Sequence, residues 1–306
     1  MKTNVTFTSS GLKLAAVLFT PEEPTSTPWP GIVIGHPGGG VKEQSPSIYA
    51  ERLAREGFAA LVFDAAYQGE SEGEPRSLED PFQRAEDVKN AVSYLSTRDD
   101  IDPGRIGALG ICASGGYVSF AAQTDLRIQA VATVSATDMG LARREGIGGT
   151  QTPEELRDLL RAANAARTAE ARGADVVRTE WLPHELPADA PQDLQEVFEF
   201  YRTPRGFHPR AVQPWPLRNL DQLIQYSSWD LISLISPRPL LMIIGSDAHT
   251  GYLSRLAIER AGEPKELFVI EGATHYSLYD QDADVTRAVA RMAEFFGKAL
   301  SSSARP

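Results

Sequence analysis

Short apolar runs alternate with helical segments along most of the chain, and this alternation limits the available folds more than any other feature. Apolar runs predict buried strands at residues 31–35, 58–63, 105–109, 128–135, 240–244 and 266–270. Periodic segments predict helices at residues 46–56, 81–98, 113–123, 252–261 and 285–300. Strands that alternate with helices build a mostly parallel sheet covered on both faces, which places the chain in the α/β class.

Two segments depart from this alternation. Residues 5–9 and 13–19 flank a turn and predict a leading antiparallel hairpin. Residues 138–237 contain no convincing buried strand and predict helices instead, at 153–172, 193–201 and 219–224. We therefore expect a core made of residues 1–138 and 239–306, with a helical cap inserted at 139–238. The cap would cover the carboxyl ends of the strands, where open α/β sheets bind ligands.

Charge and composition restrict the partners and the location. The chain of 306 residues has a formal net charge of −11, which opposes binding to nucleic acid and to anionic membranes. Its longest apolar runs, such as residues 59–63, are far shorter than the roughly 20 residues of a membrane span. Cys112 is the only cysteine, and the N-terminal residues lack the apolar core of a signal peptide. We expect a cytoplasmic protein.

The chemically most informative stretch joins a predicted strand to a predicted helix through small residues. It reads RIGALGICASGG at residues 105–116. This is the setting of a nucleophile elbow, whose tight turn requires small residues two positions before and after the nucleophile. One register makes Cys112 the nucleophile, between Gly110 and Ser114, and the other makes Ser114 the nucleophile. The end of the strand favours Cys112, and the N-terminus of the following helix would favour its thiolate.

The order of the chain predicts the other catalytic groups. His275 follows the last predicted strand and precedes the last helix, where a general base is expected, and His249 is the competitor. An acid that orients this histidine should follow the strand at residues 240–244, which selects Asp247. Asp138, after the preceding strand, is the alternative, because some hydrolases place the acid there.

An oxyanion hole needs two backbone N–H groups. Ala113, which follows the nucleophile, should supply one, and the glycine-rich loop HPGGG at residues 36–40 should supply the other. Pro37 has no N–H, so Gly38 is the expected donor. His36 has no second ligand at a suitable spacing, and no phosphate-binding glycine motif is present. We expect neither a metal nor another cofactor.

Several segments resemble the dienelactone-hydrolase-like branch of the α/β-hydrolases. They read HPGGGVKEQ at 36–44, FDAAYQGES at 63–71, GICASGGY at 110–117, YRTPRGFHPR at 201–210 and EGATH at 271–275. The closest resemblance is to a subgroup of YcjY-like proteins and fungal polyketide transferases and thiohydrolases. It implies an α/β-hydrolase fold and a Cys-His-Asp triad, with Asp64 and residues 67–71 in a structural or pocket-shaping role. The family aspartate would fall at position 248, where this chain has Ala248.

The predicted activity is cleavage of an ester, lactone or thioester through an acyl-cysteine intermediate, because a thiolate is a soft nucleophile and a good leaving group. Two alternatives stay open: acyl transfer by the same triad, and a binding protein without catalysis. The expected partner is a small acyl substrate, and a homodimer is possible. The cap contributes aromatic residues that would either contact an apolar acyl group or simply pack the cap, namely Trp181, Phe198, Phe200, Tyr201, Phe207 and Trp215.

Overall fold

The computed structural model describes residues 1–22, 27–146 and 148–301. The main sheet of this described part contains the strands β1 (Lys2–Ser9), β2 (Leu12–Phe19), β3 (Trp29–Gly35), β4 (Ala59–Phe63), β5 (Ile101–Ile111), β6 (Ile128–Val134), β9 (Leu240–Gly245) and β10 (Lys265–Ile270). Their order across the sheet is β1-β2-β4-β3-β5-β6-β9-β10. The predicted hairpin of β1 and β2 pairs antiparallel with β4, and the remaining strands are parallel.

The register of the parallel strands aligns their carboxyl ends at one edge. Gly35 of β3 pairs with Gly110 of β5, so the loop that begins at His36 starts beside the elbow at Cys112. β6 pairs with β5 on one side and with β9 on the other, which brings the loops after these strands to the same edge. Strand order and register alone therefore bring the predicted catalytic loops to one edge of the sheet.

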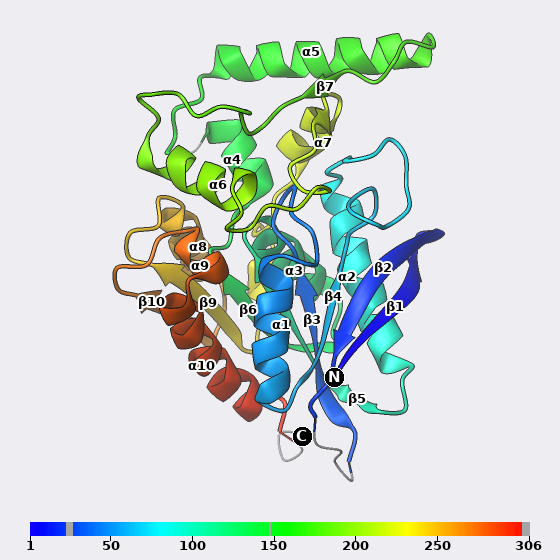
Figure 1. Ribbon diagram of the computed structural model, residues 1–306, viewed down its shortest axis with the longest axis vertical. Helices are drawn as coiled ribbons and strands as arrows, with labels where there is room; N and C mark the ends of the chain where they lie inside the picture. The colour runs from blue at the N-terminus through cyan, green and yellow to red at the C-terminus, as the bar shows by residue number, and fades with distance from the viewer. Residues whose placement is uncertain (23–26, 147, 302–306) are drawn as a thin grey trace.

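Helices cover both faces of the sheet, as the apolar alternation predicted (Figure 1). One face carries α1 (Ser45–Arg55), α9 (Ser277–Asp280) and α10 (Asp282–Ala299), and the other carries α2 (Pro81–Ser96), α3 (Ala113–Thr124) and α8 (Gly251–Arg260). Within β3, Ile32 and Ile34 pack on the face covered by α1 and α10, and Val33 packs on the face covered by α2 and α3. Burial on both faces explains why these strands have continuous apolar runs.

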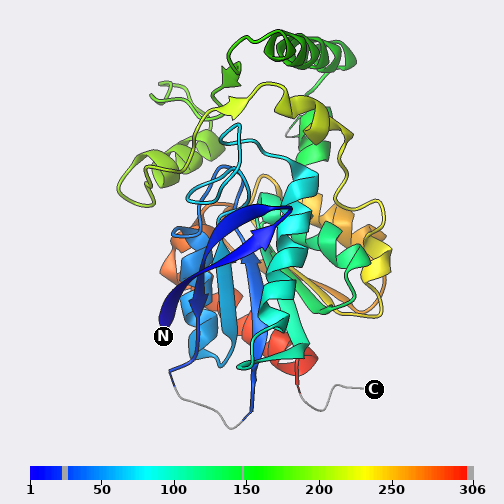
Figure 2. The ribbon, with the colours of Figure 1, turned by 90° about the vertical axis from the view of Figure 1, so that its right-hand side faces the viewer.

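The segment predicted as a cap extends beyond the carboxyl ends of the strands, and Figures 1 and 2 both show it at the top of the molecule. It contains α4 (Met139–Glu145), α5 (Pro153–Ala171), β7 (Arg178–Thr179), α6 (Gln192–Arg202), β8 (Trp215–Pro216) and α7 (Asn219–Gln225). Thr152 and Glu155 form a capping box at the start of α5, which explains where this long exposed helix begins. The short helix α4 and the two-residue strands carry too little periodicity to be predicted.

The end of the predicted cap belongs to the core. Trp229 is fully buried, and with Ile232 and Ile235 of the short 3-10 helix η1 (Ile232–Ile235) it packs against residues of α3. The inserted segment therefore returns to the core several residues before position 238.

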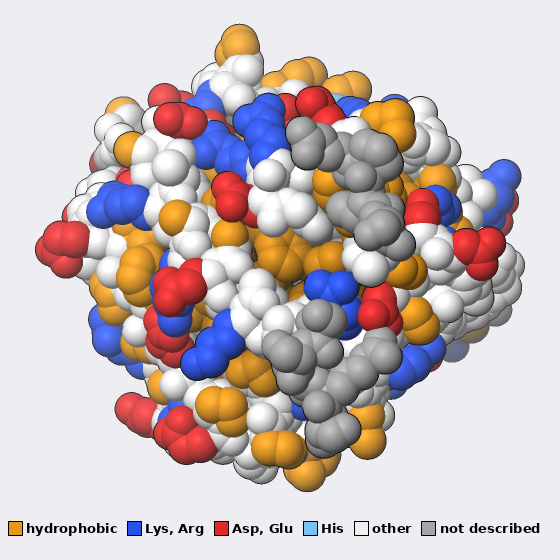
Figure 3. Space-filling view, turned by 90° about the horizontal axis from the view of Figure 1, so that it is seen from below, with side chains coloured by type: hydrophobic (Ala, Val, Ile, Leu, Met, Phe, Trp, Pro, Cys, Tyr) orange, Lys and Arg blue, Asp and Glu red, His pale blue; other side chains and the backbone are white. Residues whose placement is uncertain are grey.

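Positive and negative side chains are interspersed on the face opposite the cap. Lysine and arginine side chains alternate there with aspartate and glutamate side chains and with apolar ones (Figure 3). In the part of the chain that the structure describes, no helix is both long enough and apolar enough to cross a membrane.

Candidate active site

Cys112 occupies a strained turn between β5 and α3. Its φ is +55° and its ψ is −120°, a conformation that L-residues adopt rarely and that is typical of functional sites. The turn is so tight that a Cβ added at Gly110 would lie 2.1 Å from the carbonyl oxygen of Ser114. Glycine is therefore required two residues before Cys112, as the elbow pattern predicted.

Ser114, the alternative nucleophile, has a structural role. Its side chain is buried, and its Oγ donates to the carbonyl oxygen of His36 at 2.6 Å. The same Oγ accepts from Arg84 at 2.9 Å. Ser114 thus ties α3 to the loop that follows β3, whereas Cys112 borders a cavity. The geometry favours the register with Cys112 in the elbow.

Two backbone N–H groups point at the Cys112 sulfur. They belong to Ala113, the first residue of α3, and to Gly38, and both favour the thiolate. A Cβ added at Gly38 would lie 3.4 Å from the Cβ of Ala113, which shows how closely the two loops approach. The predicted oxyanion donors therefore lie together beside the Cys112 sulfur.

Hydrogen bonds of His36 and Arg84 fix the loop that carries Gly38. The Nε2 atom of His36 accepts from the Ala65 N–H at 3.1 Å, and its Nδ1 lies 2.7 Å from the Pro37 carbonyl oxygen. Arg84 donates to the His36 carbonyl oxygen at 2.6 Å. Burial, and then the charge of Arg84, hold the pKa of His36 well below its usual value. His36 is therefore a neutral structural residue whose ring nitrogens are both engaged.

His275 lies in the same cavity as Cys112 and is 1% exposed. Its Nδ1 lies 2.5 Å from Thr250 Oγ1, and its Nε2 lies 3.1 Å from the Tyr279 hydroxyl. The competitor His249 also lines the cavity, with its ring 5.5 Å from that of His275. His249 faces Asp193 of α6 at 4.0 Å.

The structure brings neither predicted acid to His275. Asp247 is exposed, and its carboxylate accepts from Ser246 Oγ at 2.8 Å. Asp138 is buried but accepts from the backbone N–H groups of Leu141 and Ser228, so it caps α4. Among the described residues, no carboxylate lies within ion-pair distance of the His275 ring, and the Thr250 hydroxyl contacts Nδ1 instead. The geometry therefore corrects the acid assignment: position 247 directs its side chain outward, and position 250 reaches the ring.

Tyr279 is a further site residue that the sequence did not single out, and it contacts Tyr201, one of the cap aromatics named from the sequence. The Tyr279 hydroxyl contacts His275 and also hydrogen-bonds with the side chains of Cys112 and Tyr201. Within the described chain, no hydrogen bond joins Cys112 directly to His275, so Tyr279 connects the two. Tyr201 lies in the segment 201–210 that carried the family resemblance. Tyr279 lies four residues after His275, but the helix α9 begins only at Ser277, so helical spacing in the sequence does not link the two.

Burial dominates the electrostatics of this site. It raises the pKa of the Cys112 thiol, and the hydrogen bonds from Tyr279, Ala113 and Thr137 offset only part of that effect. Burial, together with the nearby His249, lowers the pKa of His275 to about 3. Before a substrate binds, Cys112 is therefore a neutral thiol and His275 a neutral imidazole. The cost of burying a charge outweighs the predicted stabilisation of a thiolate by the N-terminus of α3.

The cavity has a volume of about 260 Å³ and lies between the core and the cap. Of the cap aromatics expected to contact a substrate, Trp181, Tyr201 and Trp215 line it. Phe200 is instead packed in the core, and Phe207 is 58% exposed. The cavity is near the lower end of the size range of small-molecule sites, about 300–1,000 Å³.

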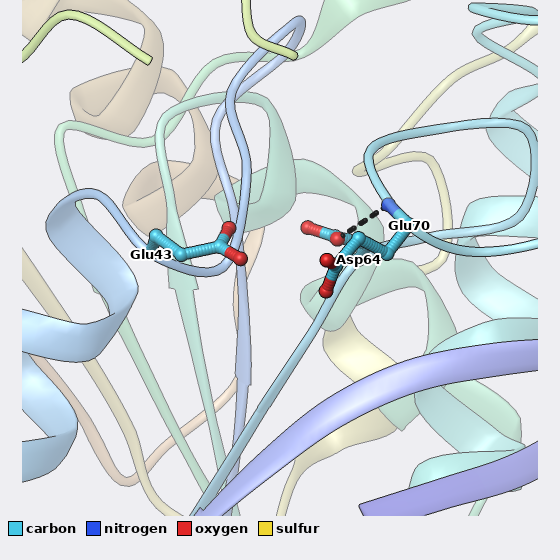
Figure 4. A group of neighbouring side chains, drawn as sticks. All are labelled: Glu43, Asp64 and Glu70. Carbon is cyan, nitrogen blue, oxygen red and sulfur yellow. Dashed lines mark hydrogen bonds between the residues drawn. The ribbon is translucent and has the colours of Figure 1, made fainter. Parts of the chain in front are cut away.

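A cluster of acids near the site is neutralised by lysine and arginine. Figure 4 shows the carboxylates of Glu43, Asp64 and Glu70 turned toward one another, close enough to hold a cation. The Lys42 ammonium lies 2.8 Å, 2.8 Å and 2.7 Å from them, respectively, and Arg210 contacts Glu43 at 3.0 Å. Asp64 also accepts from the Glu70 N–H, so the cluster fixes the loop after β4, in agreement with its expected structural role.

Comparison with known proteins places this geometry in a family. Residues 10–229 match the family model of the X-Pro dipeptidyl-peptidases, the S15 family. The chain belongs to this family. Its members are α/β-hydrolases, so the predicted fold and the predicted hydrolase class are confirmed.

Individual relatives agree with the resemblance seen in the motifs. The chain is 38% identical to the uncharacterized protein YcjY of Escherichia coli, over 98% of this chain and 100% of that protein. The crystal structure of the hypothetical protein PA2218 of Pseudomonas aeruginosa superposes with a TM-score of 0.94 at 36% identity, covering 98% of this chain and 94% of that one. Thiohydrolase aneE of Aspergillus aculeatus is 28% identical over 89% of this chain and 85% of its own.

Proposed function

We propose that the protein hydrolyses an ester, lactone or thioester through a covalent acyl-Cys112 intermediate. The observation that carries the proposal is Cys112 itself, which lies in a strained elbow with the N–H groups of Ala113 and Gly38 directed at its sulfur. A strained non-glycine residue beside two convergent backbone donors is the arrangement that acyl transfer requires.

Attack on the acyl carbon requires the thiol proton to leave. The Cys112 thiol proton passes to the Tyr279 hydroxyl oxygen while the Tyr279 proton passes to Nε2 of His275, 3.1 Å away. A new bond forms between the sulfur and the acyl carbon, and the negative charge moves to the acyl oxygen. The N–H groups of Gly38 and Ala113 stabilise this oxyanion.

Collapse of the intermediate expels the alcohol or thiol, which takes the proton held by His275. A water molecule, deprotonated by the same histidine, then attacks the thioester carbon and releases the acid and the Cys112 thiol. If an alcohol or amine enters in place of water, the product is a transferred acyl group. This is the alternative activity, and it depends on whether the cavity excludes water once the substrate is bound.

Thr250 would give His275 the correct tautomer. A proton on Nδ1 donates to Thr250 Oγ1 at 2.5 Å and leaves Nε2 free to accept a proton. A hydroxyl, unlike a carboxylate, adds no negative charge, so the imidazolium formed during attack receives little compensation. The site therefore suits substrates that need little base strength, such as thioesters and activated esters, and the name of the fungal thiohydrolase points the same way.

The test is detection of the acyl-enzyme and of its turnover. Intact mass spectrometry after mixing with p-nitrophenyl esters and with small acyl thioesters should show one acyl group per chain. Cys112→Ala should abolish it, whereas the Ser114→Ala variant should still form it. Acylation of Cys112→Ala would assign the nucleophile to Ser114 and overturn the proposal.

Two further reagents separate the alternative activities. An Xaa-Pro p-nitroanilide tests the peptidase chemistry for which the family is named, and we expect no turnover of this amide. Added alcohols or amines test acyl transfer through the ratio of transferred to hydrolysed product. Failure of every ester and thioester to acylate the wild-type protein would leave a binding protein as the remaining function.

A further inference from the structure

Arg143 is an arginine of the cap that lacks a partner at the candidate active site, whereas the described cap arginines without a partner elsewhere, Arg157 and Arg172, are exposed to solvent. It lies in α4 and lines the cavity that contains Cys112. Arg144, the next residue, donates to backbone carbonyl oxygens of Ile224 and Tyr226. In the described part of the chain, no hydrogen bond or ion pair engages the Arg143 guanidinium, which only stacks 5.4 Å from the centre of the Trp215 ring.

The surroundings of Arg143 leave its charge uncompensated. Glu79, whose charge acts on it at longer range, is already bound by Tyr117 at 2.9 Å and faces Arg84 at 3.5 Å. Asp193, which does line the cavity, faces His249. Burial lowers the pKa of Arg143, which reflects the free-energy cost of an unpaired charge in this position. A charge kept there without a partner is explained if a ligand supplies the anion.

Other groups on the same wall are donors without acceptors. Trp215 is 4% exposed, and its indole N–H has no acceptor among the described residues. The indole N–H of Trp181, whose ring lies 5.7 Å from that of Trp215, has none either. Trp29 and Trp229 also lack acceptors, but only Trp181 and Trp215 line this cavity. Both indole nitrogens are buried, so the cap side of the cavity presents one cation, Arg143, beside two indole rings.

We propose that Arg143 binds a carboxylate at the far end of the acyl chain, so that the substrates are monoesters or monothioesters of short dicarboxylic acids. This inference rests on the proposed function, because it places the reacting carbonyl at Cys112. The carboxylate pairs with the planar guanidinium, which offers parallel N–H donors that match its oxygens. The cavity of about 260 Å³ limits the acyl chain to a few carbons.

The experiment compares two esters that differ only in charge, mono-p-nitrophenyl glutarate and p-nitrophenyl glutaramate. For the wild type, we expect kcat/KM to be about 10-fold or more higher for the acidic ester, as for a hydrogen bond to a charged group. Arg143→Gln should bring the ratio close to one, and Arg143→Lys should retain part of the preference. Arg161→Gln, an exposed charge change on α5, is the matched control and should leave the ratio as in the wild type.

Two results would overturn the inference: a wild-type ratio near one, or a ratio that Arg143→Gln leaves unchanged. If neither ester acylates Cys112, the proposed function fails and binding is measured directly. Free glutarate should then raise the melting temperature of the wild type and not that of Arg143→Gln, with glutaramide as the neutral control. Equal shifts in both proteins would reject the carboxylate site independently of catalysis.

Discussion

The loops after β5 and β9 both reach the carboxyl edge of the sheet, but they contribute to the site in different ways. In the loop after β5, the backbone sets the geometry: the φ of Cys112 positions its thiol, and the N–H of Ala113 lies beside the sulfur. The loop after β9 supplies a side chain, and the side chain that reaches His275 is Thr250, three residues beyond the predicted Asp247. Backbone groups follow from strand register, whereas a side-chain contact depends on the path of the loop.

The largest expected effect tests the elbow itself. Cys112→Ser should retain the fold and lose most of the esterase activity, because a hydroxyl ionises far less readily than a thiol in the same buried turn. The measurement is kcat/KM with the best p-nitrophenyl ester, with circular dichroism as the control for folding. Activity equal to the wild type would mean that the thiol is not required.

The second effect concerns the base. His275→Ala should lower kcat/KM by about 10²–10⁴-fold, the usual contribution of a general base. His249→Ala is the matched comparison, because His249 lines the same cavity without contacting Tyr279. A larger loss in His249→Ala would reassign the base.

Substitutions at Thr250 test directly whether the loop after β9 contributes a side-chain hydroxyl to the site. Thr250→Val removes the acceptor next to Nδ1 at nearly constant volume and should lower kcat/KM by about 10-fold, equivalent to one buried hydrogen bond. Thr250→Ser should restore most of the activity because it keeps the hydroxyl. If serine is no better than valine, Thr250 acts only through packing.

The pH profile reports whether a carboxylate compensates the imidazolium. The pKa of His275 is about 3, so its ring stays neutral as the pH falls through 6.5. We therefore expect kcat/KM to change by less than about twofold between pH 5 and 7, where one pKa unit corresponds to about 1.4 kcal/mol. An acid limb centred near pH 6.5 would show that a negative group reaches His275 in the working enzyme.

The smallest effect on kcat/KM is expected for Asp247, the acid that chain order predicts. Asp247→Asn should leave kcat/KM within about twofold of the wild type, because an exposed substitution without a site contact has little effect. Asp138→Asn should instead lower the free energy of unfolding by about 1 kcal/mol. Both Asp138 oxygens accept from buried N–H groups, of Leu141 and Ser228, and the amide would replace one acceptor by a donor. A loss of activity in Asp247→Asn comparable to that of Thr250→Val would restore the predicted triad.

Much of the fold could be predicted because local patterns and global architecture agree. The apolar runs of β3, β4 and β9 and the periodicity of α2 and α10 are visible in the sequence. The short elements α4 and η1 could not be predicted, because a few residues carry no periodicity. Tertiary contacts hold them in place: η1 packs against α3, and Arg144 of α4 donates to the carbonyl oxygens of Ile224 and Tyr226.

The sequence by itself determined the elbow, since only small residues around Cys112 permit such a turn, and it determined that Gly38 and Ala113 would meet beside it. Chain order also selected His275. Tertiary structure alone decided that the hydroxyls of Thr250 and Tyr279 contact that histidine, and that Arg143 lines the cavity without a partner. The physical reason is that the pairing of neighbouring strands fixes the positions of the backbone groups at their ends. Side-chain contacts between loops and the cap depend instead on how segments distant in the sequence pack together.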